Sequence, residues 1–301
     1  MGEGTGPRSP SMLDLVRLSS LPLFPPGGED LYRQIARLTH LSPGLDLLDV
    51  ACGRGISLEY FVREYKVNGT GVEEDSHLIA QAEAHLRESG LGRNASFQEA
   101  SPSDLPFRDE TFDVVVGEMG LAATVDPGDA IRELVRVARP GGRVVLVQLV
   151  WQAQVDSSRK KVLSEHLGAR PLMAVELRRI LMDGGVGGLH TEDWIDGGTA
   201  FRSKARKPFP DFAELFTLGE KLKILGRARK RFGWRGVWTV FQREIEVHRL
   251  LTKERVLGLN LLIGVKAGPA QDGCGEGGEA LDGDLQAYGL PLFGLEGGKG
   301  S

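Results

Sequence analysis

The chain has 301 residues, of which 41% are hydrophobic and 26% are charged, and its formal net charge at pH 7 is −4. This composition is ordinary for a soluble globular protein, and the negative balance argues against a general nucleic-acid binder. No apolar stretch is long enough to span a bilayer, and the polar start is unlike a signal peptide, so we expect a cytoplasmic protein. Cys52 and Cys274 lie far apart and predict no disulfide.

The N-terminal region precedes the regular part of the sequence. Residues 1–11 are rich in glycine, proline and polar residues and predict a disordered lead. Residues 12–44 show weak helical patterning interrupted by prolines, which predicts a helical cap.

From residue 45 onward, strand and helix patterns alternate. Predicted strands cover 47–50, 68–72, 95–99, 112–116 and 143–150, and predicted helices cover 57–65, 76–88 and 129–138. This alternation predicts an α/β fold with a doubly wound, mostly parallel sheet. Ligands of such sheets bind beyond the carboxyl ends of the strands, so the residues that follow each strand are the candidate ligand contacts.

After residue 150 the pattern is less regular. A helix over 175–182, a sixth strand over 188–195 and a seventh over 256–266 complete the predicted sheet. The α/β domain therefore comprises 45–200 and 256–267, with a mostly helical insertion over 201–255. Residues 268–301 are glycine-rich and acidic, which predicts a disordered tail.

A glycine turn follows the first strand. Asp49 ends that strand, and Gly53 and Gly55 precede the next helix. Glycines let backbone approach a ligand closely, and a helix start offers unpaired N–H groups. A carboxylate at Asp49 is costly in a buried strand unless it caps the turn or meets a cationic ligand. The spacing does not fit the G-x-G-x-x-G pattern of dinucleotide-binding proteins.

An acid also ends the second strand. Glu73 lies 20 positions after Gly53, where a carboxylate can accept hydrogen bonds from both hydroxyls of a ribose. Because NAD and S-adenosylmethionine share that ribose, Glu73 indicates an adenosine ligand rather than one reaction. Glu74 and Asp75 are weaker candidates, and Asp75 could instead cap the next helix.

Four motifs in order resemble class I S-adenosylmethionine-dependent methyltransferases of the UbiE/COQ5 type, which act on small molecules. They are the D-x-[AG]-C-G-x-G turn at 49–55, Glu73, the loop at 103–107 with the strand that follows, and the Arg-Pro-Gly-Gly turn at 139–142. The resemblance covers 46–151 and extends weakly to 266. It implies a seven-stranded Rossmann-like sheet with S-adenosylmethionine as cofactor. The cofactor-binding residues that it implies are Asp49, Ala51, Gly53, Gly55, Glu73, Glu74, Asp104, Leu105, Gly117 and Glu118.

Two of these positions need comment. Ala51 replaces a more usual glycine, which the turn should tolerate if the φ angle of Ala51 is negative. In the loop at 103–107, Asp104 could accept from the adenine amine, and the Leu105 backbone N–H could donate to a ring nitrogen.

The resemblance implies methyl transfer to a small, hydrophobic or aromatic acceptor by in-line displacement. The fourth strand is not followed by an Asn/Asp-Pro-Pro-aromatic turn, which lowers the expectation of a nucleic-acid base as acceptor. In the resembling family the segment between the last two strands covers the acceptor, so the aromatic residues between 201 and 241 suggest a pocket for a lipophilic acceptor, with the core of a small helical subdomain as the alternative. The basic run over 221–235 is either a solvated face or a weak contact with a membrane surface.

Other assignments stay open at the level of sequence. An NAD(P)-dependent oxidoreductase and a non-catalytic S-adenosylmethionine-binding module are the alternatives. No catalytic residue is assigned, although Glu118 and His190 are general-base candidates by position. The histidines show no metal-ligand spacing, so we expect no metal site, and the sequence does not indicate an oligomeric state.

Overall fold

The computed structural model describes residues 10–11, 14–15, 18–19, 27–121, 125–167, 169–194, 217–252 and 256–268. All of them belong to one compact unit of the chain, Met1–Pro269. The predicted lead up to residue 9, the predicted insertion up to residue 216 and the predicted tail beyond residue 268 lie outside the described residues.

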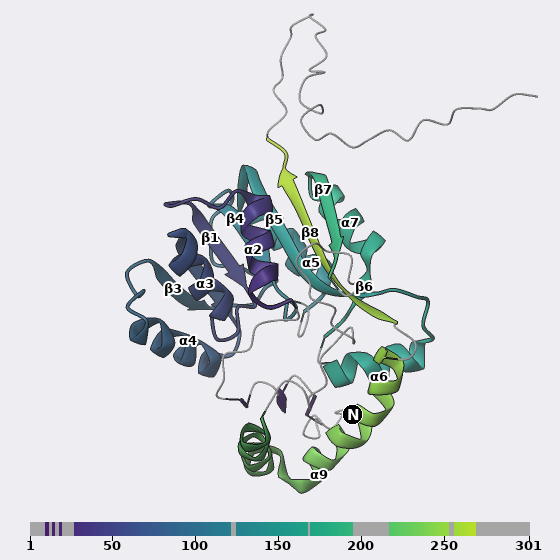
Figure 1. Cartoon of the computed structure of the whole chain (residues 1–301). Helices are drawn as coiled ribbons and strands as arrows, with labels where there is room; N and C mark the ends of the chain where they lie inside the picture. The colour runs from purple at the N-terminus through teal and green to yellow at the C-terminus, as the bar shows by residue number, and fades with distance from the viewer. Residues whose placement is uncertain are drawn as a thin grey trace, which may run out of the picture. The chain divides into compact units, whose positions relative to one another are not determined.

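The described residues form one mixed sheet of eight strands (Figure 1). The strands are β1 (Asp46–Val50), β2 (Asn68–Glu73), β3 (Ala95–Glu99), β4 (Phe112–Gly117), β5 (Ala138–Trp151), β6 (Leu172–Met173), β7 (Val186–Asp193) and β8 (Leu257–Lys266). Their order is β3-β2-β1-β4-β5-β8-β7, and β6 pairs with β5. The strands from β3 to β5 are parallel, whereas β8 runs antiparallel to both of its neighbours.

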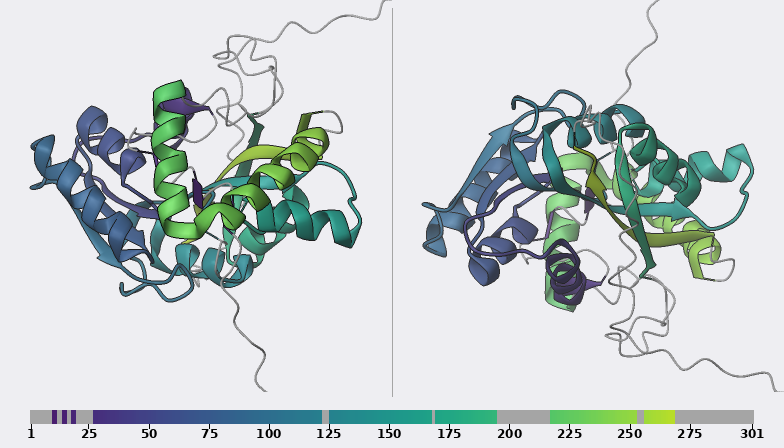
Figure 2. Two further views of the ribbon diagram at one scale, coloured as in Figure 1. Left: turned by 90° about the horizontal axis from the view of Figure 1, so that it is seen from below. Right: turned by 90° about the horizontal axis from the view of Figure 1, so that it is seen from above.

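Helices cover both faces of the sheet (Figure 2). The helices on the faces are α2 (Gly28–Thr39), α3 (Ile56–Tyr65), α4 (Ser76–Glu88), α5 (Pro127–Val137) and α7 (Ala174–Asp183). Two further helices, α6 (Ser157–Leu167) and α9 (Leu218–Thr252), pack against each other beyond the end of the strands (Figure 1). Successive strand residues point to opposite faces. Leu47 therefore packs with the core that includes α2 and α3, and Leu48 packs with the core that includes α5 and α7. Both leucines are fully buried, and each such burial contributes about 1.5–3 kcal/mol.

The predicted doubly wound α/β fold is confirmed, with local differences. Strand β5 begins at Ala138, five residues before the predicted start, although the sequence at 140–142 predicts a turn between helix and strand. Gly141 has a φ of 76°, and the pairing register with β4 shifts between Phe112 and Val114, so the strand continues through an irregularity. The short β6 and helix α6 were not predicted, and β6 makes the sheet eight-stranded instead of seven-stranded.

Helix α9 is bent into two arms at Gly233. This glycine has a φ of 69° and a ψ of 173°, outside the helical region, and glycine adopts such angles without steric cost. Ile224 and Ala228 in the first arm, and Val237 and Val240 in the second, share a small buried core with Leu15. Within the described part of the chain, no helix is sufficiently long and apolar to cross a membrane.

Candidate functional site

The carboxyl ends of β1, β2 and β4 meet at one edge of the sheet. In the pairing register, Val50 of β1 lies beside both Val72 of β2 and Gly117 of β4. Asp49, Glu73 and Glu118 therefore come from neighbouring strand ends, and the fold gathers the three acids named from the sequence.

Asp49 is fully buried, and only one of its two carboxylate oxygens has a hydrogen-bond donor within the described part of the chain. Its Oδ2 accepts a hydrogen bond from the Ser57 hydroxyl of α3 at 2.5 Å. Its Oδ1 is buried and has no hydrogen-bond partner among the described residues. Burial raises the pKa of Asp49 well above its ordinary value, the charge of Glu118 raises it further, and the bond from Ser57 opposes both. A buried acceptor without a donor is costly, so this oxygen suits a ligand that brings a donor or a positive charge.

Glu118 follows β4 and is half-buried. The hydroxyl of Tyr32, on α2, donates to Glu118 Oε1 at 3.2 Å. Burial raises the pKa of Glu118 to about 7, although hydrogen bonds from Ser57 and Tyr32 favour its charged form. Sequence reasoning missed Tyr32 and Ser57. Ser57 could have been found as a polar residue at the start of the helix after the glycine turn, whereas Tyr32 carries no such signal.

The two glycines of the turn have different reasons to be glycine. Both have left-handed backbones, with φ 56° at Gly53 and 70° at Gly55. A Cβ on Gly55 would lie 2.4 Å from Phe97 Cζ, so packing inside the protein excludes a side chain there. A Cβ on Gly53 would meet nothing within 4 Å. Gly53 therefore borders open space, where a ligand can approach the backbone.

Ala51 differs from the sequence-based expectation. Its φ is 61°, so the condition of a negative φ, under which the replacement of glycine should be harmless, was wrong. A left-handed backbone brings Cβ close to the following carbonyl oxygen, at a cost of about 1–2 kcal/mol for a residue other than glycine. The turn therefore holds local strain beside the buried Asp49.

Glu73 ties the glycine turn to the end of β2. Its side chain is almost completely buried, with 7% of the residue exposed. Oε2 accepts from the Gly53 N–H at 3.0 Å, and Oε1 accepts from the N–H groups of Glu74 and Asp75 at 3.1 and 3.2 Å. A carboxylate offers about four acceptor positions, so about one remains open on Oε2. Glu74 itself is half-buried.

The loop after β3 does not present the predicted backbone donor. The N–H of Leu105 donates to Glu133 Oε2 at 2.8 Å, so it is not available for an adenine ring in this structure. Arg136 fixes the arrangement, because it pairs with Glu133 at 2.7 Å and donates to the Leu105 carbonyl at 2.9 Å. Asp104 is exposed in the same loop, so its side chain faces solvent.

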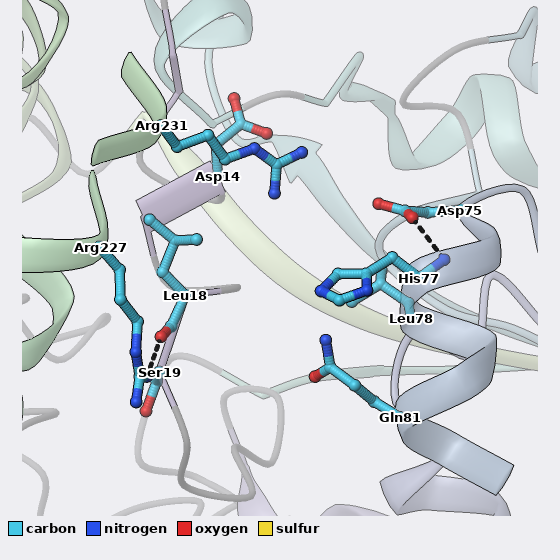
Figure 3. Close-up of a pocket in the computed structure, with 9 residues that line it drawn as sticks. All are labelled: Asp14, Leu18, Ser19, Asp75, His77, Leu78, Gln81, Arg227 and Arg231. Carbon is cyan, nitrogen blue, oxygen red and sulfur yellow. Dashed lines mark hydrogen bonds between the residues drawn. The ribbon is translucent and has the colours of Figure 1, made fainter. Parts of the chain in front are cut away.

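A cavity of about 320 Å³ lies between α4 and α9. Figure 3 shows His77 and Gln81 of α4 facing Arg227 of α9 across it. The α4 side also includes Asp75, whose carboxylate caps the helix by accepting from the His77 N–H at 2.9 Å. The cavity thus begins two residues after Glu73, although its lining does not include Asp49 or Glu118.

The charge at the strand ends is unbalanced. Among the described residues, no lysine or arginine forms an ion pair with Asp49, Glu73 or Glu118. Opposite charge favours the ionised form of a buried carboxylate, so the site suits a cationic ligand. No group of three or more metal-ligating side chains occurs in the described ranges.

His190 is not part of this arrangement. It lies in β7, the edge strand, which β8 and β5 separate from β4. Its Nε2 lies 2.9 Å from Glu192 Oε1. Of the two general-base candidates, only Glu118 is therefore near the acids at the strand ends.

Residues 48–146 match the model of a methyltransferase domain. Over 107 residues the chain is 34% identical to the ubiquinone/menaquinone biosynthesis C-methyltransferase UbiE of Idiomarina loihiensis, and the match covers 35% of this chain and 43% of that protein. The chain spans about half the length of the curated relatives it matches.

Solved structures share the fold. The crystal structure of the [4+2]-cyclase SpnF has a TM-score of 0.62 and 23% identity, and the match covers 80% of this chain and 82% of that one. The phosphoethanolamine N-methyltransferase 2 of Haemonchus contortus, in complex with S-adenosyl-L-methionine, has a TM-score of 0.63 and 16% identity. The match covers 85% of this chain and 57% of that one.

Proposed function

We infer that this chain, whose residues 48–146 are a class I S-adenosylmethionine-dependent methyltransferase domain, transfers a methyl group to a small-molecule acceptor. The observation that carries the proposal is the buried Asp49 with one unpartnered oxygen, next to Glu118 and without a basic partner among the described residues. An ammonium or sulfonium group supplies the missing positive charge. The open space beside Gly53 gives such a ligand a path to the backbone.

We assign the cofactor contacts by position. Asp49 and Glu118 would hold the positively charged methionine end, with Gly117 beneath it and Gly53 beside it. Glu73 would accept from the ribose, because Oε2 keeps an acceptor position. The remaining predicted contacts would lie around the ribose and adenine: Ala51, Gly55, Glu74, Asp104 and the apolar side chain of Leu105.

The bound cofactor would supply a methyl group on a good leaving group. The residues of this chain then contribute mainly by alignment, since holding reactants in line can lower a barrier by roughly 7–11 kcal/mol. Where the acceptor must lose a proton, Glu118 is the best-placed base of this chain, because a pKa of about 7 suits proton transfer near neutral pH. Tyr32, which donates to Glu118 Oε1, would position that carboxylate.

The acceptor that we propose is small and hydrophobic or aromatic. The relative named UbiE acts in quinone biosynthesis by its name, and the aromatic content of 201–255 supports a lipophilic acceptor covered by that region. We propose no nucleic-acid partner, a cytoplasmic location, and a weak contact of 221–235 with a membrane surface.

The test has two stages. Calorimetry with S-adenosylmethionine should show binding that Asp49→Ala and Glu73→Ala each weaken by about an order of magnitude or more. Incubation with methyl-labelled cofactor and a metabolite extract should then yield a labelled small molecule. Binding of NADPH without binding of S-adenosylmethionine would favour an oxidoreductase. Cofactor binding without transfer to any metabolite would favour a non-catalytic module.

A further inference from the structure

Helix α9 exposes an apolar surface on both arms. Leu218, Leu222 and Leu225 precede the bend at helical spacing, and Trp234, Trp238 and Phe241 follow it at the same spacing, so each set shares one side of its arm. We call these six residues the tryptophan face. The two indole residues are 64% and 65% exposed, and Leu218 and Leu222 are 79% and 69% exposed. Leu225 and Phe241 are half-buried and pack against the small core that includes Leu15. Four large apolar side chains so exposed on one helix indicate an interaction surface.

Four of these residues line a groove at the bend. The groove has a volume of about 510 Å³ and is lined by Leu225, Trp234, Arg235, Val237, Trp238 and Phe241. None of these residues belongs to the carboxyl edge of the sheet, where the proposed cofactor site lies. The lining contains none of Asp49, Glu73 and Glu118, so the kind of occupant is inferred from the side chains around the groove itself.

The charge around the tryptophan face indicates which kind of partner could bind it. Residues 218–242 contain seven lysines and arginines and one acid, Glu220, whereas the whole chain has a formal net charge of −4. The Arg229 guanidinium lies 5.1 Å from the centre of the Trp234 ring, and Arg235 lines the groove. Neither arginine has an ion pair among the described residues, and the same holds for Lys230. Basic and aromatic side chains are thus interleaved on the same surface.

We propose that the tryptophan face docks on an anionic lipid membrane. A helix with lysine and arginine beside tryptophan and leucine lies in the plane of a bilayer interface. The indoles would enter the interface, and the basic side chains would meet lipid phosphates. A single-stranded nucleic acid could stack on the indoles and bind the arginines, but it would leave Leu218 and Leu222 without a partner. A bilayer uses the leucines, the indoles and the charges together.

The proposal deepens the proposed function in one respect, because it rests on a lipophilic acceptor for its biological use. Docking would place the enzyme where such an acceptor partitions. The docking itself requires neither the cofactor nor the acceptor, so the two proposals can fail separately.

The protein carries its own reporters for the test. Of its four tryptophans, Trp151 and Trp194 are buried, with 4% and 1% exposure, whereas Trp234 and Trp238 are exposed. Iodide should therefore quench only the two exposed indoles of the full chain in buffer. Vesicles of phosphatidylcholine with phosphatidylglycerol should shift the emission to shorter wavelength and protect those indoles from iodide. Vesicles of phosphatidylcholine alone should do so weakly.

Variants separate the apolar and the charged contributions. Trp234→Ala with Trp238→Ala should weaken co-sedimentation with anionic vesicles about tenfold or more. Arg229→Gln, Lys230→Gln and Arg235→Gln combined should weaken it on the order of 100-fold, because each basic side chain near an anionic surface contributes about fivefold. A control pair of exposed apolar residues on α7, Val175→Ser with Met182→Ser, should bind vesicles like the unaltered chain.

Four results would overturn the proposal. They are no binding to anionic vesicles, equal binding by the tryptophan variant, indoles already protected from iodide in buffer by a second copy or another segment of the chain, and tight binding of single-stranded RNA that vesicles cannot displace. Calorimetry with S-adenosylmethionine in the absence of lipid reports on the cofactor site alone. A protein that binds S-adenosylmethionine but not anionic vesicles would therefore contradict only the membrane proposal.

Discussion

Replacement of Asp49 by asparagine tests whether the buried acid serves a ligand or the fold. The change keeps the shape of the side chain and removes its capacity for negative charge. In the structure this carboxylate has one oxygen bound to Ser57 and one without a described partner, and Glu118 repels its charged form. If the acid exists for a cationic ligand, Asp49→Asn should weaken binding of S-adenosylmethionine and should not destabilise the ligand-free protein.

The size of the binding effect follows from the strength of the interaction that the substitution removes. A hydrogen bond to a charged group contributes about 1.5–3 kcal/mol, and each 1.4 kcal/mol is about tenfold in affinity. Asp49→Asn should therefore raise the dissociation constant about 10- to 150-fold. Asp49→Asn weakens ligand binding, but it should increase the stability of the ligand-free protein, by an amount that depends on pH. Because the pKa of Asp49 is raised in the folded state, the native protein holds this proton longer than the unfolded chain, and stability falls as pH rises above the ordinary pKa of the carboxyl group.

Calorimetry and thermal melting read the two effects separately. The variant should melt at a higher temperature than the unaltered protein at about pH 8, and the difference should shrink as the pH is lowered to about 4, near the ordinary pKa of the carboxyl group. Asp113→Asn is the matched control, because Asp113 also lies in a parallel strand but pairs with Arg139 at 2.6 Å near the amino end of β4, away from the carboxyl ends. The control should melt at a lower temperature and keep its cofactor affinity. Unchanged affinity together with lower stability in Asp49→Asn would mean that the carboxylate serves the fold.

The remaining predictions concern neighbouring positions. Affinity for the cationic cofactor should increase as pH rises through about 7, where Glu118 loses its proton, and calorimetry of Glu118→Gln should show a flatter pH profile. Gly55→Ala should lower the melting temperature more than Gly53→Ala does, because a Cβ on Gly55 would collide with Phe97. Gly53→Ala should instead cause the larger loss of cofactor affinity. The reverse order would contradict the inference that Gly53 borders open space. His190→Ala should leave the rate of methyl transfer unchanged, and a rate loss of about 100-fold or more would restore it as a base.

The sheet could be predicted because its patterns are local. Strand β3 and helix α4 have the predicted bounds, since alternating apolar positions and the cap at Asp75 are visible in the sequence. Strand β5 was predicted too short, because Pro-Gly-Gly ordinarily ends an element, and only pairing with β4 carries the strand through it. The two residues of β6 are too few for any periodicity, so their pairing with β5 is purely a tertiary effect.

The candidate site was predictable where it follows the strand ends. Asp49, Glu73 and Glu118 could be named because parallel strands end at one edge. Tyr32 could not, because α2 reaches Glu118 only through packing between segments 86 positions apart. The engagement of the Leu105 N–H by Glu133 likewise depends on a long-range contact. The backbone angle of Ala51 could not be read from residue type, which favours a negative φ.

The position of Glu73 has a consequence for the arrival of a nucleoside. Its Oε1 already accepts from two amides and its Oε2 from a third, while a ribose would bring two hydroxyl donors to about one vacant lone pair. One hydroxyl can take that vacant position, but if both hydroxyls bind Glu73, one of the three amides must give up its acceptor. Amide hydrogen exchange at Gly53, Glu74 or Asp75 should then accelerate in the presence of the ligand, although the surrounding strands exchange more slowly. A ribose hydroxyl would then bind Glu73 by replacing a backbone amide that already donates to this carboxylate.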